Sequence, residues 1–473
     1  MAYRRTKGYK SGNSRVQGAC GRRAERQRGV QNMDSYNYDR NNLPIPSQAG
    51  YTAETSVNGY TMGVGALSSP SDIFHAGRLF WIADTGNDRI IVAINDFSKA
   101  MTLDTFTRPD GTQTSLKSPT GVFVSGNIIY IADSGNSRII IADSMGNVVN
   151  EITKPDSVIY DSNKTFVPQK VLADGNGNIY VVLNNITSGT ALFSTDCEFR
   201  GFFGADRVNR TSDALRDYLA FLFVSDSKRS RQTRSIPTGI ANFDIDGDFI
   251  FTCSPSSVRR LNPSGDDIFE SENTVFGDYK PLYDTSGYNI PSADIVDLDV
   301  SADDYINCLD RSTGRIFQYD SEGNLIFIIG GEGKQSGLFQ QACAVESADG
   351  RIYVLDSMKN SVTVFAETEF GRIVHQANDL CNGGYYEESL DLWQKVLEMD
   401  GNYNHAYEGL ASAYLQKGEY EKSMHYAELS YSQEIYNKAY EGFRRDFVKS
   451  HFGLIFSVII LSVVLLKKMR RKK

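Results

Sequence analysis

A segment of twelve residues that occurs twice constrains the fold of this chain more than any other feature. Residues 81–92 read WIADTGNDRIIV, and residues 130–141, which lie 49 positions further on, read YIADSGNSRIII. A proline with an apolar residue three positions after it precedes each copy, at Pro70 and Pro119, and a third such proline is Pro168. Similarity at a fixed period of this size indicates stacked supersecondary units.

Each unit has the pattern of a small antiparallel meander. Short runs rich in β-branched and aromatic residues, such as residues 122–124 and 128–131, are bounded by Gly, Ser and Asn, which is typical of strands. The Asp-Thr/Ser-Gly-Asn quartet between two runs predicts a tight turn, because Gly and Asn tolerate positive φ and an Asp side chain can bond the backbone two residues on. We expect Gly135 to take that positive φ.

The aspartates of these turns line up as a possible carboxylate ring, but their place in a repeated turn favours a structural role. The residues assigned to structural turns are Asp84, Gly86, Asn87, Asp133, Gly135, Asn136, Asp310 and Asp356.

Four weaker copies follow near residues 178–182, 248–251, 305–317 and 350–365, which gives six units in all. One meander cannot bury both of its faces, whereas copies packed face to face around an axis can, so the pattern predicts a propeller. The last unit lacks an obvious fourth strand after Phe365. Residues 51–58 have the pattern of a lone strand, and we expect them to complete the last blade and remove an exposed edge.

The run GNIIYIADSGNSRI at residues 126–139, with its preceding proline, resembles the NHL repeat. The resemblance covers about two thirds of the chain and implies a mainly β fold, a six-bladed NHL-type β-propeller. Six-bladed relatives of this kind include sugar lactonases and lyases that use a metal in the central channel. No ligand set of theirs can be carried over residue by residue to this sequence.

After residue 366 the hydrophobic period becomes helical. Five positions return 34 residues later, namely Ala377, Leu380, Gly384, Tyr386 and Ser389 as Ala411, Tyr414, Gly418, Tyr420 and Ser423. This period, with Gly-x-Tyr before the second helix of each pair, resembles the tetratricopeptide (TPR) repeat. A third first helix begins near Ala439, so the resemblance implies two and a half repeats.

Residues 452–466 contain no charged side chain, and we interpret them as a membrane anchor. A helix of this length covers about 22 Å, short of the ~30 Å hydrocarbon core, but Phe447, Val448 and snorkelling lysines can extend it. The alternative is a buried helix, which a segment apolar on every face fits less well. The residues assigned to the anchor include Phe452, Leu454, Ile455, Phe456, Ile459 and Leu465.

Residues 467–473 carry six positive charges in seven positions, so we expect a cytoplasmic C-terminus and a single-pass cell-membrane protein whose bulk is extracytoplasmic. The alternative places the bulk on the cytoplasmic side. Export would need a signal peptide, and residues 1–33 have no apolar run. Either the true start lies upstream, as we expect, or the anchor acts as its own late signal. The order of propeller, TPR pair and anchor resembles bacterial surface proteins of Gram-positive type.

Five segments follow from these patterns. They are a basic leader and linker, expected to be disordered, at residues 1–50; an NHL-type propeller at 51–366; TPR-like repeats at 367–447; a transmembrane helix at 448–467; and a basic tail at 468–473. One spacing breaks the period, because Pro168 and Pro237 lie 69 residues apart. The surplus contains a predicted helix at 211–224 and a basic run at 228–234. It is either a docking element or, as we favour, a solvated insertion.

Composition limits the chemistry. The net charge of −9 argues against nucleic-acid binding. No two of the five histidines are four residues apart, so we expect no zinc site, no cofactor and no catalytic residue. Residues 244–248 resemble part of a calcium loop but lack its glutamate, and we interpret them as a hairpin turn. Of the six cysteines, Cys253, Cys308 and Cys343 are expected to be buried free thiols.

Two classes of function remain. The first is a membrane-anchored extracytoplasmic binding or scaffold protein, whose propeller and helical repeats bind a protein partner or a ligand. The family resemblance also allows a role beside a solute uptake system. The second is a propeller hydrolase or lyase of the sugar-lactonase type with a channel metal. We expect protein partners and a membrane, and a small-molecule or carbohydrate ligand stays open.

Overall fold

The computed structural model describes residues 35–39, 41–161, 163–204, 239–269, 275–279 and 293–470. This part forms two compact units, a β unit within residues 51–366 and a second unit that joins residues 35–50 to residues 367–470. The basic leader, the predicted helix at 211–224 and the basic run at 228–234 lie outside the described residues.

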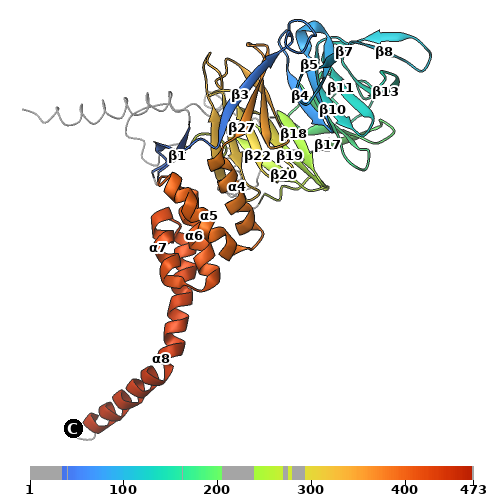
Figure 1. Cartoon of the computed structure of the whole chain (residues 1–473). Helices are drawn as coiled ribbons and strands as arrows, with labels where there is room; N and C mark the ends of the chain where they lie inside the picture. Colours follow the sequence, from blue (N-terminus) through green and yellow to red (C-terminus); the bar gives the residue numbers. More distant parts are fainter. Residues whose placement is uncertain are drawn as a thin grey trace, which may run out of the picture. The chain divides into compact units, whose positions relative to one another are not determined.

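The β unit is a ring of six antiparallel sheets, numbered here as blades I to VI in chain order (Figure 1). Blade I holds β4 (Asp72–Ala76), β5 (Leu79–Asp84), β6 (Arg89–Ile94) and β7 (Ala100–Leu103). Blade II holds β10 (Pro119–Ser125), β11 (Ile128–Asp133), β12 (Arg138–Asp143) and β13 (Val148–Ile152). Blade III holds β14 (Pro168–Ala173), β15 (Ile179–Leu183), β16 (Thr190–Phe193) and β17 (Phe199–Phe203).

The described part of blade IV holds β18 (Asn242–Asp246), β19 (Phe249–Ser254) and β20 (Ser257–Leu261). Blade V holds β21 (Ile295–Val300), β22 (Ile306–Asp310), β23 (Arg315–Tyr319) and β24 (Leu325–Gly330). Blade VI holds β25 (Ala342–Ala348), β26 (Arg351–Asp356), β27 (Ser361–Glu367) and, from the other end of the unit, β3 (Tyr51–Asn58). The first strand of each blade contacts the first strand of the next, all the way round. The mainly β, six-bladed fold is therefore confirmed.

The ring is closed by a strand from its own N-terminus. β3 lies beside β27 as the outermost strand of blade VI, as the sequence predicted. Arg351 in β26 and Glu54 in β3 form an ion pair of 3.0 Å, and the ring of Tyr51 packs edge-on against Phe327 of blade V. Closure gives the third strand of the last blade a partner, so it presents no unpaired edge.

The core lies between the blades, because each sheet is apolar on both faces. Trp81 and Val92 of blade I meet Val122 and Ile131 of blade II in one buried cluster. The opposite face of blade I presents the next residues along the same strands, such as Ile82 and Ile91, to blade VI. Alternation of side chains along a strand thus supplies two neighbouring interfaces at once.

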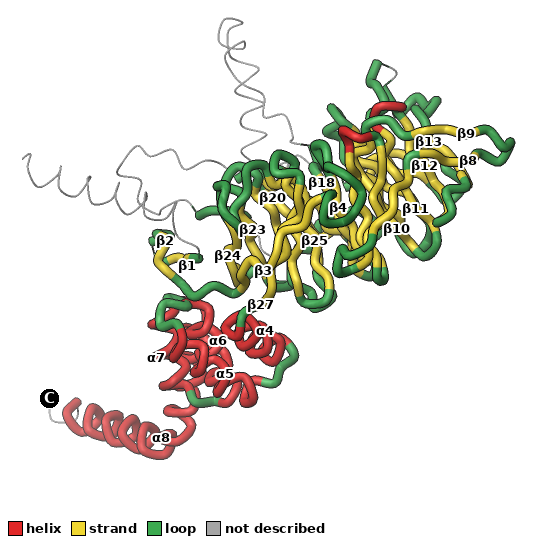
Figure 2. Tube along the Cα trace, turned by 45° about the horizontal axis from the view of Figure 1, so that its top comes forward, coloured by secondary structure: helices red, strands yellow, loops and turns green. Residues whose placement is uncertain are grey.

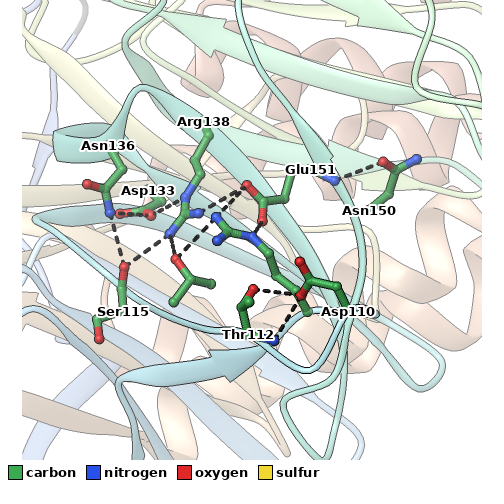
Figure 3. Close-up of polar contacts among 10 residues, drawn as sticks. Asp110, Thr112, Ser115, Asp133, Asn136, Arg138, Asn150 and Glu151 are labelled. Atoms are coloured by element: carbon green, nitrogen blue, oxygen red, sulfur yellow. Dashed lines mark hydrogen bonds and ion pairs between the residues drawn. The ribbon is translucent and has the colours of Figure 1, made fainter.

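A hairpin outside the blade pattern joins blades I and II. It consists of β8 (Thr105–Thr107) and β9 (Gln113–Ser115), and it buries Phe106 completely. Its polar contacts centre on Glu151 of β13, which accepts hydrogen bonds from Arg108 at 2.6 Å and from Arg138 at 3.0 Å (Figure 3). Burial favours a higher pKa for Glu151, but the two guanidinium groups outweigh it and lower that pKa.

The described helices form a stack in which each packs against the next (Figure 2). They are α4 (Glu369–Asn382), α5 (Tyr386–Met399), α6 (Asn404–Lys417), α7 (Tyr420–Ser430) and α8 (Gln433–Arg470). The close approach of α5 and α6 needs Gly409, since a Cβ there would lie 2.4 Å from the ring of Trp393. Gly418 ends α6 at a φ of 77°, a conformation that glycine adopts without strain.

Residues 35–50, expected to be a linker, instead belong to the helical unit. They form a short hairpin of β1 (Tyr36–Tyr38) and β2 (Pro44–Pro46). Asp400 at the end of α5 accepts hydrogen bonds from Ser47 Oγ at 2.5 Å and from the backbone N–H of Gln48 at 2.9 Å. Thr368, which caps α4, donates its N–H to the carbonyl of Gly50 at 2.9 Å. A polar sequence with two prolines resembles a linker because these contacts use backbone groups and distant side chains, which local composition does not reveal.

α8 continues well beyond the helical stack. It is long and apolar enough to cross a membrane, with a mean hydropathy of 2.2 over its most apolar window, none of which is buried in the protein. Of the six residues assigned to the anchor, Phe452, Leu454, Phe456, Ile459 and Leu465 are exposed and Ile455 is partly exposed. An exposed apolar surface of this size is what a lipid-facing helix presents.

Candidate functional site in the propeller channel

The innermost strands of the six blades surround a channel whose wall holds buried ionisable groups. A hollow in this channel is lined by polar side chains from five of these strands. They are Asp72 of β4, Lys170 of β14, Asn242 and Asp244 of β18, Asp297 of β21 and Glu346 of β25. Buried ionisable side chains gathered in a hollow mark the default position for a functional site.

One group of these side chains joins non-adjacent blades. Lys170 of blade III forms an ion pair with Asp72 of blade I. Asp72 also accepts the backbone N–H of Val122 in blade II at 2.8 Å. Between them, these two side chains connect three blades across the channel.

Asp297 holds blade V to both of its neighbours. It accepts the side-chain amide of Asn242 in blade IV and the backbone N–H of Val345 in blade VI, the latter at 2.7 Å. Burial raises the pKa of Asp297 to about 7, even though Lys170 acts to lower it. Lys170 itself stays charged, because the Asp72 and Asp297 carboxylates outweigh its burial and raise its pKa.

A second group consists of Asp244 of blade IV, Asp299 of blade V and Glu346 of blade VI, and we call it the carboxylate series. Asp244 accepts the N–H of Val300 at 2.7 Å, Asp299 accepts the N–H of Ser347 at 3.1 Å, and Glu346 accepts the N–H of His75 at 2.9 Å. In each case the donor belongs to the inner strand of the next blade. Every member of the series is therefore bonded across a blade boundary.

Burial is the main cause of the altered acidity in this series. It raises the pKa of Asp244 to about 8, with a further contribution from the Asp299 carboxylate. It also raises the pKa of Asp299 and, together with Asp299 and Asp244, that of Glu346 well above its usual value. Burial and the mutual repulsion of the negative charges therefore both favour the protonated forms of Asp244 and Glu346.

These contacts indicate the role of the carboxyl groups that line the channel. The carboxylates are engaged by main-chain donors of the ring itself, so their first role is to hold blades together. Within the described ranges, no group of three or more His, Cys, Asp or Glu side chains is placed to hold a metal ion. The residues 244–248, which resemble part of a calcium loop, form the hairpin between β18 and β19, with Gly247 at a φ of 56°.

The aspartates of the repeated turn lie away from the channel hollow. Asp84 and Asp133 are fully buried, and each accepts a backbone N–H from the loop before its blade, from Ser68 at 2.7 Å and from Lys117 at 2.8 Å. The other oxygen of Asp133 accepts from Asn136 and Arg138, as Figure 3 shows, and that of Asp84 accepts from Asn87 and Arg89.

The weaker copies keep the bond from the loop before the blade, but their other partners differ. Asp310 accepts the N–H groups of Asp294 at 3.0 Å and of Ser312 at 2.8 Å. Asp356 accepts those of Gln340 at 2.7 Å and Met358 at 2.9 Å. These bonds are those of a turn that holds its own blade together.

The role expected for Gly135 is wrong in its mechanism. The residue with positive φ is Ser137, at 54°, and its counterpart in blade I is Asp88, at 55°. Gly135 is needed for a close approach, because a Cβ there would lie 2.6 Å from the carbonyl oxygen of Lys117. Gly86 packs in the same way against Ser68. Spacing alone locates the turn but does not say which of its residues is left-handed.

The channel residues are not among those predicted from the sequence, although the repeat contains a signal for them. Asp72, Gly121 and Lys170 occupy one position of the repeat at 49-residue intervals. A Cβ on Gly121 would lie 2.9 Å from the Cα of Lys170, so the small residue makes room for the strand that carries the lysine. In all three copies the next residue is apolar, whereas this position is an acid, a glycine or a base. Such a position indicates a surface inside the ring that is lined by polar side chains.

Comparisons with known proteins give structural neighbours only. No family model and no curated protein matches the chain. Virginiamycin B lyase from Staphylococcus aureus is 10% identical over 67% of this chain and 100% of its own, with a TM-score of 0.41. A streptogramin B lyase structure is 10% identical over 68% of this chain and 100% of its own, with a TM-score of 0.41. The extracellular domain of a one-component system from B. thetaiotaomicron is 11% identical over 62% of this chain and 32% of its own, with a TM-score of 0.35.

Proposed function

We propose that this protein is a membrane-anchored binding or scaffold protein, in which the propeller and the helical repeats bind a partner at the membrane. The observation that carries the proposal is the use made of the channel carboxyl groups. Asp244, Asp297, Asp299 and Glu346 each accept a backbone N–H from the neighbouring blade, so they serve the ring as fasteners. Bonds of this kind support a structural use of the carboxyl groups in the channel wall.

The finer parts of the proposal rest on the sequence. The repeats resemble NHL and TPR units, which supports a protein partner as the first ligand class. The six positive charges of residues 467–473 support a cytoplasmic tail and an extracytoplasmic propeller. The order of propeller, TPR-like repeats and anchor along the chain is similar to that of Gram-positive surface proteins. This similarity supports a role beside a solute uptake system.

The competing function is that of a propeller hydrolase or lyase with a channel metal. Three measurements separate it from the binding function: metal content and lactone turnover of the full chain purified in mild detergent, and cross-linking of the chain in membranes. The binding function predicts less than stoichiometric divalent metal, no turnover of sugar lactones, and a partner that can be cross-linked to the chain in membranes. The partner should be lost when residues 367–430 are removed, while Gly175→Ala, a substitution at a position with no neighbour for a Cβ, should keep it. One bound metal ion per chain together with lactone turnover would refute the binding function.

A further inference from the structure

The blade boundaries of this propeller are fastened by two different chemistries. Between blades I and II and between blades II and III, uncharged hydroxyl groups of the repeated turn take part. Thr85 Oγ1 donates to the carbonyl of Pro119 at 2.8 Å, and Ser134 Oγ donates to the carbonyl of Pro168. The copies of the turn in blades V and VI begin with Asp310 and Asp356 but continue differently, and the boundaries there are fastened by carboxyl groups of the inner strands.

The carboxyl groups of the second half of the ring have little positive charge to balance them. The titratable and charged groups that face the carboxylate series and Asp297 are Asp72 and His75 from β4, Lys170 from β14, Cys253 from β19, Cys308 from β22 and Cys343 from β25. The ammonium group of Lys170 is already bonded to Asp72. The ring of His75 lies with Nε2 3.1 Å from Asn95 Oδ1. Four carboxyl groups therefore share one committed lysine and one histidine.

We propose that blades IV, V and VI, with their junction to blade I, form a pH-responsive half of the ring, tightest when its buried carboxyl groups hold protons and loosened as they ionise. The geometry supports this because each of these groups is bonded to the next blade, so repulsion between them acts on the blade boundaries. Blade II serves as the reference for comparison. Hydroxyl groups of the repeated turn bond across both of its boundaries. The carboxyl group that bonds to it from blade I, Asp72, is paired with Lys170.

The direction follows from linkage. The pKa of Asp297 is raised to about 7 and that of Asp244 to about 8 by burial. A group whose pKa is higher in the folded chain stabilises the fold fully below its unfolded pKa, about 4 for an aspartate, and loses that contribution as the pH rises through the folded value. Loosening is therefore expected to develop between about pH 4 and about pH 8, and the last step of it between pH 6 and pH 8.

Hydrogen exchange of the full chain in detergent at pH 6 and pH 8, with times corrected for the intrinsic rate, tests this. Peptides from β21 and β25 should exchange roughly tenfold faster or more at pH 8, whereas those from β11 and β12 should change by less than about threefold. Asp244→Asn keeps an oxygen for the N–H of Val300 but cannot ionise, so it should reduce the difference at β21 and β25. Glu346→Gln should act in the same direction, and it replaces Asp244→Asn if that variant does not fold.

Asp84→Asn is the matched control. Asp84 is a buried aspartate of the same propeller, but it is bonded to Arg89 within its own blade. This variant should lower stability without removing the pH effect at β21 and β25. Equal corrected exchange of β21 and β25 at pH 6 and pH 8, or an unchanged pH effect in both the Asp244→Asn and Glu346→Gln variants, would overturn the proposal.

Discussion

The aspartate of the repeated turn forms hydrogen bonds within its own blade. The hydroxyl group of the next residue forms a hydrogen bond to the neighbouring blade. Asp133 holds the loop at Lys117 and the side chain of Arg138, while Ser134 bonds the carbonyl of Pro168. Gly135, which follows Ser134, has no side chain, so the loop at Lys117 can lie directly against the turn. One short motif therefore fixes both the shape of a blade and its distance from its neighbour, which explains why it repeats at the period of the blades.

Gly135→Val tests the close approach at this turn. The new side chain would meet the carbonyl oxygen of Lys117 at 2.6 Å, which backbone atoms can relieve only by moving. The free energy of unfolding should fall by about 1–3 kcal/mol, the usual cost of overpacking, in a denaturant titration. Gly175→Ala, where a Cβ meets nothing within 4 Å, should stay within about 0.5 kcal/mol of the parent chain. An unchanged midpoint for Gly135→Val would show that the loop yields freely.

Lys170→Met tests the ion pair that crosses the channel. It removes the cation from a pair whose side chains are only 13% and 9% exposed, so Asp72 would be left buried without its cationic partner. We expect the free energy of unfolding to fall by about 3–5 kcal/mol. The double variant Asp72→Asn, Lys170→Met should recover much of this loss. A double variant as unstable as the single one would mean that the lysine acts by packing and not by charge.

At the scale of elements, the N-terminal part of the described chain belongs to both units. Residues 35–50 are bonded to α4 and α5, and β3, which follows directly, is the outer strand of blade VI. A chain lacking residues 1–34 keeps every described contact and should unfold at nearly the same temperature as the parent. A chain lacking residues 1–58 loses the closing strand together with the contacts of residues 35–50, and its unfolding midpoint should fall by at least about 5 °C in a thermal scan. Equal midpoints for the two deletions would argue against closure by β3.

Strand closure and blade number were predictable because both depend on local patterns. The period of 49 residues, the strand runs and the missing last strand are all visible in the sequence. The channel was not, because Asp244, Asp299 and Glu346 come together only when blades IV, V and VI are packed, and each looks like an ordinary polar residue in a strand. The contacts of residues 47–50 were hidden for the same reason, since Asp400 lies more than 350 positions away.

At the scale of the whole molecule, the chain combines a closed propeller, a helical stack and one apolar helix. The carboxyl groups of the channel wall bond neighbouring blades to one another. The basic residues after the apolar stretch of α8, Lys467, Lys468 and Arg470 among them, give the anchor its direction in our proposal. A binding protein held in this way would present its propeller to the space outside the cell.

The most direct test of this account is protease accessibility of the full chain in its native membrane. The chain should stay with the membrane after carbonate extraction, and protease added to intact spheroplasts should remove the propeller and leave a small anchored fragment. A cytoplasmic marker must stay intact in the same sample. Exchange of Lys467, Lys468 and Arg470 for glutamine should weaken the preferred direction and protect part of the propeller. A propeller that is digested only after lysis, or a chain that carbonate releases, would contradict the account.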